Sequence, residues 1–170
     1  IKLRGSSFRE GFHDYSIRRG GLEIYPRLIA AEHHPGFKQE KLLSGVAEID
    51  ALWGGGVDRG TSTLIMGPAG CGKSTIAAGY AIAAAKRGEH AIIYLFDEGV
   101  DTMLARLAGL GMGADEQIKA GRLVLEQIDP AELSPGEFVA RIRQRARDGK
   151  SRIIIIDSLN GFLNAMPGEQ

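Results

Sequence analysis

The sequence predicts an α/β fold in which helices flank a parallel sheet, preceded by a short β-rich segment. Apolar strands alternate with stretches of helical periodicity between residues 61 and 157, the pattern of successive βαβ units. The last strand holds four consecutive isoleucines at 153–156, as expected of a parallel strand buried on both faces. The 170 residues include 24 glycines, about twice the usual share, and these mark the turns between segments.

Composition excludes several classes of protein. Lys and Arg total 21 and Asp and Glu total 21, so the formal net charge of zero argues against a strongly basic nucleic-acid-binding protein. A single cysteine excludes an internal disulfide framework and a zinc site built only from cysteines. The sequence has no apolar run long enough to span a membrane and no signal-peptide pattern at its start, so we expect a cytoplasmic protein.

The first 43 residues are predicted to hold short strands followed by a linker. Residues 2–4, 13–17 and 22–25 are expected to be extended, and a Gly-Gly turn separates the last two. Residues 27–43 show no sustained period and contain a Pro-Gly break, which predicts a linker.

From residue 44 onward the pattern changes to regular helices and strands. Apolar residues recur at helical spacing over 46–53, and three glycines then stop that helix. Ser134 and Pro135 form a helix start, and the helix is expected to run to about Asp148. The other predicted segments are strands at 61–66, 90–96, 123–125 and 153–156 and helices at 73–86 and 100–107.

The motif G-x-x-x-x-G-K-[ST] occupies residues 67–74, between a predicted strand and a predicted helix. Its glycines let backbone N–H groups turn inward toward phosphate oxygens, and the start of the helix adds the positive end of its dipole. Lys73 places a catalytic charge on the outer phosphates, and the Ser74 hydroxyl completes the coordination of Mg²⁺. The predicted nucleotide-binding residues are Gly67, Pro68, Ala69, Gly70, Cys71, Gly72, Lys73, Ser74 and Thr75.

Acidic residues follow two of the predicted strands. Asp157 ends the isoleucine strand, and Asp97 and Glu98 end the strand at 90–96. Open parallel sheets bind ligands at this edge, so we expect both carboxylates of the pair to face the γ-phosphate. Asp157 and Asp97 are predicted to join Ser74 at Mg²⁺, while Asp97 or Glu98 orients or deprotonates the attacking water. The alternatives are structural: Asp157 as a helix cap, and the pair as a solvated cap.

A run of basic residues surrounds the last predicted helix. A solvated or subunit-contacting face is favoured over a DNA site, because apolar residues of the same helix face the core. The basic residues are Arg141, Arg143, Arg145, Arg147, Lys150 and Arg152.

Further segments extend these motifs. They are Ser44-Gly45-Val46, Ile49-Asp50, Gly54-Gly55-Gly56, Gly60-Thr61, Phe96-Asp97-Glu98 and Ile156-Asp157-Ser158-Leu159. Together with the phosphate loop, they resemble the RecA superfamily, and most closely the KaiC group of circadian clock proteins, whose members carry two RecA-like ATPase domains in tandem. Near the N-terminus, Lys2-Leu3-Arg4-Gly5-Ser6 and residues 20–26 resemble the closing strands of a first KaiC-like domain.

The resemblance implies a division of the chain and a set of roles. Residues 1–26 would close an upstream RecA-like domain, 27–43 would form the linker, and 44–170 would be the N-terminal half of a RecA-like P-loop ATPase domain. Proteins of this group form hexameric rings that bind ATP·Mg²⁺ between subunits. The positions that match Lys2 and Arg4 reach the phosphates of a neighbouring subunit, with Leu3 between them and Ser6 near the same nucleotide.

The carboxylate pair departs from the family, where it is Glu-Glu with the first Glu as base. Here the pair is Asp97-Glu98, and which of the two acts as base stays open. The resemblance also implies that one more strand lies between the phosphate-loop strand and the Asp157 strand, and that this strand and the autophosphorylated Ser/Thr positions follow Gln170. We therefore expect a piece of a longer chain, inactive alone, or a sheet completed by another copy.

Three functions remain open at this point. The first is a KaiC-type ATPase, with or without Ser/Thr autokinase activity, in signalling or clock-type regulation with regulatory protein partners. The second is a RecA-type DNA-handling recombinase or accessory ATPase, and the third is nucleotide binding without turnover. Zero net charge and the KaiC-like N-terminal segment favour the first.

Overall fold

A parallel sheet of three strands, in the order β6-β5-β7, forms the centre of the molecule. The computed structural model describes residues 11–28, 40–147 and 151–164. β5 (Ala91–Leu95) pairs with β6 (Leu123–Gln127) on one side and with β7 (Ile153–Asp157) on the other. All five residues of β5 are buried, as expected of a strand that is covered on both faces. The predicted α/β fold with a parallel sheet and an initial β-rich segment is confirmed.

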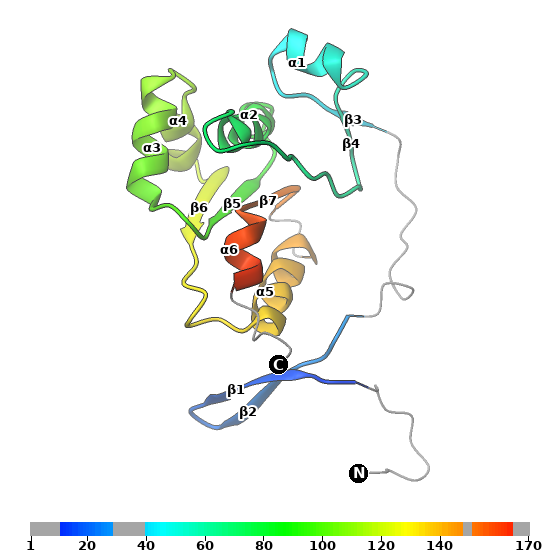
Figure 1. Ribbon diagram of the computed structural model, residues 1–170, viewed down its shortest axis with the longest axis vertical. Helices are drawn as coiled ribbons and strands as arrows, with labels where there is room; N and C mark the ends of the chain where they lie inside the picture. Colours follow the sequence, from blue (N-terminus) through cyan, green and yellow to red (C-terminus); the bar gives the residue numbers. More distant parts are fainter. Residues whose placement is uncertain (1–10, 29–39, 148–150, 165–170) are drawn as a thin grey trace.

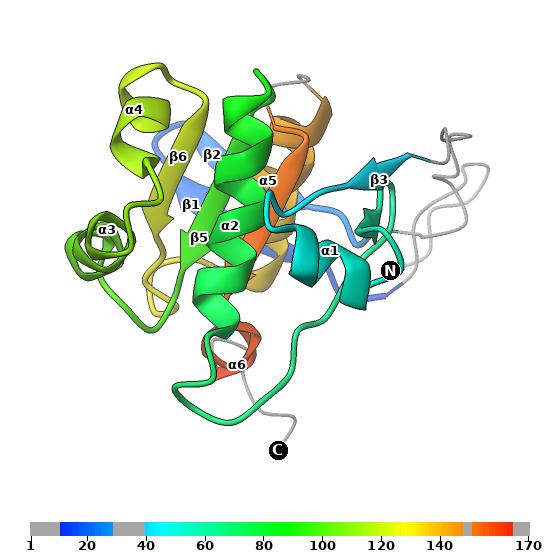
Figure 2. The same ribbon diagram turned by 90° about the horizontal axis from the view of Figure 1, so that it is seen from above.

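Helices cover both faces of this sheet (Figures 1 and 2). α2 (Lys73–Lys86), α3 (Val100–Gly109) and α4 (Ala114–Lys119) lie on one face, and α5 (Pro135–Arg147) and α6 (Leu159–Asn164) lie on the other. Side chains alternate along β5, so that Ile93 and Leu95 pack toward α2 and α3, whereas Ile92 and Tyr94 pack toward Phe138 of α5. Four buried alanines of α2 let that helix approach the sheet closely.

A β-hairpin lies against the start of α5, on the side away from the sheet (Figure 1). β1 (Asp14–Arg18) and β2 (Gly21–Tyr25) pair antiparallel, as the sequence predicts. The contact with α5 is polar: an Asp14 oxygen accepts a hydrogen bond of 2.5 Å from the Gly136 N–H, and Ser16 donates to Glu137 at 2.8 Å. A Cβ on Gly136 would lie 2.6 Å from the Asp14 carboxylate, so this approach requires glycine.

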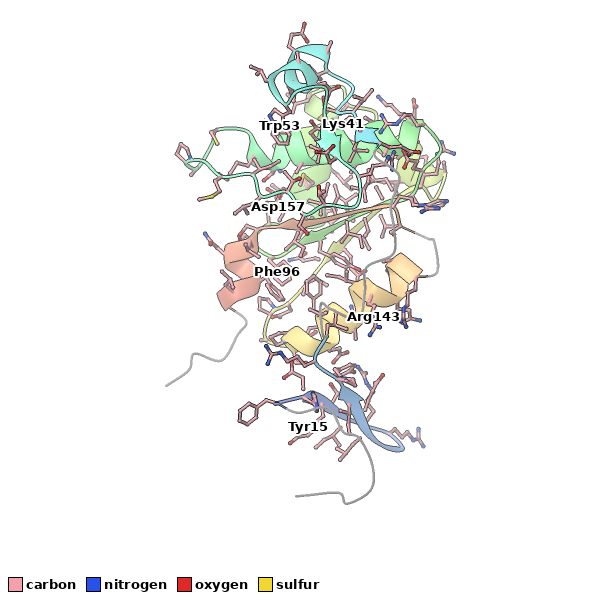
Figure 3. The ribbon with its side chains drawn as sticks, turned by 90° about the vertical axis from the view of Figure 1, so that its right-hand side faces the viewer. Tyr15, Lys41, Trp53, Phe96, Arg143 and Asp157 are labelled. Carbon is pink, nitrogen blue, oxygen red and sulfur yellow. The ribbon has the colours of Figure 1, made fainter. Side chains whose placement is uncertain are left out.

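A small unit packs over α2 at the opposite end from the hairpin (Figures 1 and 3). It comprises β3 (Lys41–Leu42), α1 (Ala47–Leu52) and β4 (Val57–Asp58), with β3 and β4 antiparallel. The helix predicted at 46–53 is therefore present. The predicted linker, in contrast, already holds a strand at its last residues, because Lys41 and Leu42 pair with β4.

The structure differs from the sequence prediction at 61–66 and in two short helices. Residues 61–66 form no strand, and Leu64 and Met66 are exposed. A strand needs a partner for its backbone groups, and within the described residues β7 pairs only with β5. α4 and α6 were not predicted, since each has six residues and too few apolar positions to show a helical period.

None of the described helices is both long and apolar enough to cross a membrane.

Candidate nucleotide-binding site

The phosphate loop leads directly into α2, which begins at Lys73 as predicted. Gly70 and Gly72 both adopt positive φ, 78° and 89°, a region that favours glycine, and Gly72 is the N-cap residue of the helix. The Lys73 ammonium group donates to the carbonyl oxygens of Gly67 and Pro68 at 2.9 and 2.7 Å. The loop is thus curled around the amine, with the first N–H groups of α2 unpaired by helix geometry.

The loop is tight on its inner side. A Cβ on Gly67 would lie 2.6 Å from the sulfur of Cys71, and the Lys73 amine lies 4.0 Å from the same sulfur. Cys71 is a free and exposed cysteine, whereas Ser74 and Thr75 are half-buried in the first turn of α2.

A buried carboxylate supports the segment that precedes this loop. Asp50 of α1 accepts a hydrogen bond from the Ser44 N–H at 2.8 Å and another from the Tyr80 hydroxyl of α2 at 3.4 Å. The bond from Ser44 lowers the pKa of Asp50, and burial, together with the Asp50 charge, raises the pKa of Tyr80. Trp53 also packs on the Tyr80 ring at 5.7 Å between centroids. These contacts tie the small unit to α2.

The loop lies at the edge of the sheet where β5 and β7 end. Figure 2 shows the first turn of α2 and α6, the helix that follows β7, at the same end of the sheet. The register pairs Leu95 with Asp157, and the Phe96 N–H donates to the Asp157 carbonyl at 2.8 Å. Figure 3 shows Asp157 and Phe96 on neighbouring strand ends.

Asp97 points toward β7 and α6. Its carboxylate accepts a short hydrogen bond from the Ser158 hydroxyl, the residue next to Asp157. Ser158 in turn accepts from the Gly161 N–H at 3.2 Å, so it also caps α6. A Cβ on Gly161 would lie 2.7 Å from an Asp97 oxygen, which means that only glycine lets α6 approach this closely. The structure therefore brings Asp97, Asp157 and Ser158 together.

Glu98 points elsewhere, which differs from the expectation that both carboxylates face one phosphate. Both of its oxygens accept hydrogen bonds of 2.7 Å from the guanidinium of Arg106, which lies toward the C-terminal end of α3. Asp97 and Glu98 lie in the bend that follows β5, and their carboxylates are separated because one binds Ser158 and the other binds Arg106.

The oxygen atoms available at the edge suit Mg²⁺ held partly by a nucleotide. Within the described part of the chain, no group of three or more His, Cys, Asp or Glu side chains is arranged to hold a metal alone. Mg²⁺ is usually bound by one or two carboxylates together with phosphate oxygens and water. The Ser74 hydroxyl and the carboxylates of Asp157 and Asp97 are oxygen donors of that kind.

The remaining predicted residues are four near the N-terminus and the basic run. Lys2, Leu3, Arg4 and Ser6 fall outside the described residues. In the basic run, Arg141 and Arg145 both form ion pairs with Glu126 of β6, at 2.8 and 3.2 Å.

Sequence reasoning missed two residues of the site, Ser158 as partner of Asp97 and Arg106 as partner of Glu98. A serine after a strand-ending acid and before a helix is a capping signal that could have been used for Ser158. Glu98 precedes α3 and Arg106 lies within it, so the i,i+3 and i,i+4 spacing of side-chain pairs on a helix does not predict this contact.

Comparison with known proteins agrees with this geometry. The family model described as "ATPase: KaiC" matches residues 42–169. The chain is 25% identical to circadian clock protein KaiC2 of Synechocystis sp. over 97% of its own length and 29% of the relative's. It is 27% identical to circadian clock oscillator protein KaiC of Synechococcus elongatus, over 95% of its length and 31% of the relative's.

The chain thus spans less than a third of the length of these relatives. Since the family model covers most of the sequence, from β3 through the phosphate loop to α6, the chain belongs to the KaiC ATPase family.

Proposed function

We propose that this chain binds ATP with Mg²⁺ and provides the phosphate-binding and acidic residues of an ATP-hydrolysing KaiC-type domain. The observation that carries the proposal is a juxtaposition. A glycine-rich loop that curls around Lys73 opens α2 at the sheet edge where Asp157 ends β7 and Asp97 follows β5. This is the arrangement in which an open parallel sheet accepts a nucleotide.

Each residue has a role that follows from its position. Backbone N–H groups of 67–74 would hold the phosphates, with the Lys73 amine turning from the loop carbonyls to the outer phosphate oxygens. The Ser74 hydroxyl and the Asp157 carboxylate would hold Mg²⁺, the latter through water. Bound there, Mg²⁺ would neutralise charge on the β- and γ-phosphates.

Asp97 is the better candidate for the residue that orients the attacking water. It is exposed at the edge and fixed by Ser158, whereas Glu98 is engaged with Arg106. Asp97 is one methylene shorter than the family's glutamate. We therefore expect it to orient the attacking water and to contact Mg²⁺ rather than to act as the general base that removes a proton from that water.

The complete protein is proposed to work as a homo-oligomer, a hexameric ring in the cytoplasm. Lys2, Leu3, Arg4 and Ser6 would approach the nucleotide of a neighbouring subunit, which makes turnover depend on assembly. We expect this stretch alone to bind nucleotide but not to hydrolyse it. Autokinase activity, regulatory protein partners and a signalling or clock role are proposals for the whole protein.

A DNA-handling function has less support. Two arginines of the basic run, Arg141 and Arg145, form ion pairs with Glu126. The net charge of the chain is zero. Binding of single-stranded DNA with a steep loss of affinity over a salt series would favour the RecA-type alternative.

The experiment compares Lys73→Ala and Asp97→Asn in the complete protein, by calorimetric binding of ATP·Mg²⁺ and by phosphate release. Lys73→Ala should abolish binding at this site, so that the variant binds one ATP·Mg²⁺ fewer per chain than wild type. Asp97→Asn should keep affinity within about threefold and lower kcat by roughly a hundredfold or more. Lys86→Ala, an exposed lysine at the other end of α2, is the matched control and should change neither. Wild-type stoichiometry of ATP·Mg²⁺ binding in Lys73→Ala would refute the proposed site.

A further inference from the structure

Two consecutive carboxylates at the end of β5 are held by different parts of the molecule. Asp97 is bonded to Ser158 on the β7–α6 side, and Glu98 is bonded to Arg106 on α3. The Glu98–Arg106 pair has two parallel hydrogen bonds of 2.7 Å, the geometry that fixes direction as well as distance. The two side chains are only 25% and 34% exposed, so this is not an ordinary surface ion pair.

Arg106 is itself anchored to the core. Its neighbours on α3, Met103 and Leu107, are fully buried in the cluster between the sheet and its covering helices. The guanidinium donates to the Met103 sulfur at 3.0 Å, and its Nε is buried with no hydrogen-bond partner. A buried Nε without a partner is costly, which indicates that the arginine is kept in place by the bond to Glu98.

We propose that Arg106 is a positioning residue for the ATPase reaction. By clamping Glu98 it fixes the backbone of 97–98, and so holds Asp97 at the sheet edge beside Asp157. The inference rests on the proposed function and extends it, because it assigns Glu98 to positioning and adds a residue, Arg106, that never touches the nucleotide.

The chemistry of the edge explains why such a clamp matters. Hydrolysis needs a water held in line with the γ-phosphate, and a displacement of about 1 Å in the group that orients it can cost on the order of a hundredfold in rate. Ser158 and Gly161 fix Asp97 from the side of α6. Arg106 would supply the constraint from the opposite side, through Glu98.

The opposite hypothesis is that Glu98 is the base and that Arg106 merely restrains it until the nucleotide is bound. The two hypotheses predict opposite changes in turnover when Arg106 is removed. If Arg106 positions the site, its removal lowers turnover. If Arg106 restrains a catalytic Glu98, its removal raises turnover or leaves it unchanged, and Glu98→Gln abolishes it.

The test uses Arg106→Met, Arg106→Lys, Glu98→Gln and the double variant Glu98→Gln/Arg106→Met in the complete protein. Arg106→Met should lower kcat by about tenfold to a hundredfold, with KM for ATP within about twofold. Arg106→Lys should recover part of the loss, since it keeps the charge but not the paired bonds. Glu98→Gln should be milder, because its amide oxygen still accepts from Arg106. The double variant should be no worse than Arg106→Met.

Three measurements make the outcome decisive. Lys119→Met, which removes an exposed charge from neighbouring α4, should leave kcat unchanged. Hydrogen exchange at the amides of 97–99 should accelerate in Arg106→Met, and this readout needs no turnover. Unchanged exchange, unchanged or raised kcat in Arg106→Met, or complete loss in Glu98→Gln alone would overturn the proposal. A wild-type protein that hydrolyses no ATP would refute the proposed function, and the exchange data would still decide whether Arg106 fixes residues 97–98.

Discussion

The two halves of the candidate site are held in place by different means. The acids stand at the end of β5 and β7, and β5 is a fully buried strand that is paired on both sides. The phosphate loop follows residues 61–66, which form no strand and leave Leu64 and Met66 exposed. The position of the acids is therefore set by the core of the fold, whereas the shape of the loop is set locally by glycines, Lys73 and the start of α2.

The largest expected effect comes from a matched pair of truncations in the two halves. Ile93→Ala removes a side chain that is 1% exposed at the centre of β5, and should lower the free energy of unfolding by about 2–5 kcal/mol. Leu64→Ala removes one that is 63% exposed, and should change it by less than about 0.5 kcal/mol. Denaturant unfolding of both variants gives the comparison.

A large cost for Leu64→Ala would contradict the structure and favour the sequence prediction. It would mean that residues 61–66 are buried in a strand, and that both halves of the site depend on one sheet.

The second test separates backbone shape from packing in the loop. A Cβ on Gly72 would meet nothing within 4 Å, but Gly72 has φ of 89°, so Gly72→Ala acts through backbone strain alone. Forcing the loop out of this conformation should weaken ATP·Mg²⁺ binding by about tenfold, corresponding to about 1.4 kcal/mol. Calorimetric titration measures the effect.

Gly109→Ala is the control for this substitution. Gly109 also has open space around it but lies in α3 with an ordinary helical conformation, so alanine there should be neutral or stabilising. Equal loss of affinity in both variants would show that the shape of the phosphate loop is not what binds nucleotide.

Much of the sheet and its main helices could be predicted from the sequence, because local patterns determine them. The isoleucine strand became β7, and the alanine-rich stretch became α2 with the predicted bounds. The predicted strand at 61–66 is absent because strand formation is not a local property. An apolar, extended segment still needs a neighbouring strand to pair with its backbone groups.

The positions of the phosphate loop and of the acids could be predicted from the sequence, whereas their side-chain partners could not, and the roles of these residues stay predictions. The phosphate-loop motif and the acids after the strands can be recognised from their spacing, and in the structure Asp97 binds Ser158, the residue that follows Asp157 at the end of β7. The separation of Asp97 from Glu98 depends on Ser158 and Arg106, which lie on other elements. Such side-chain contacts are tertiary: the sequence offers a capping signal for Ser158, but it does not show that Ser158 binds Asp97 or that Arg106 binds Glu98.

The smallest expected effect concerns an ion pair that joins the two halves. Arg59, two residues before the segment at 61–66, donates to both oxygens of Glu89 at 2.7 and 2.6 Å, and Glu89 lies two residues before β5. Hydrogen bonds from Arg59 hold the pKa of Glu89 below its ordinary value of 4.5. A lowered pKa in the folded state means that the pair stabilises the protein above pH 4.5, and that this stabilisation is lost as the pH falls through the folded value. Arg59→Met should therefore lower stability by about 1 kcal/mol at pH 7, and the difference from wild type should shrink as the pH falls below 4.5. A difference that stays constant with pH would mean that Arg59 acts through the packing of its stem rather than through Glu89, and the link between the halves would then not be electrostatic.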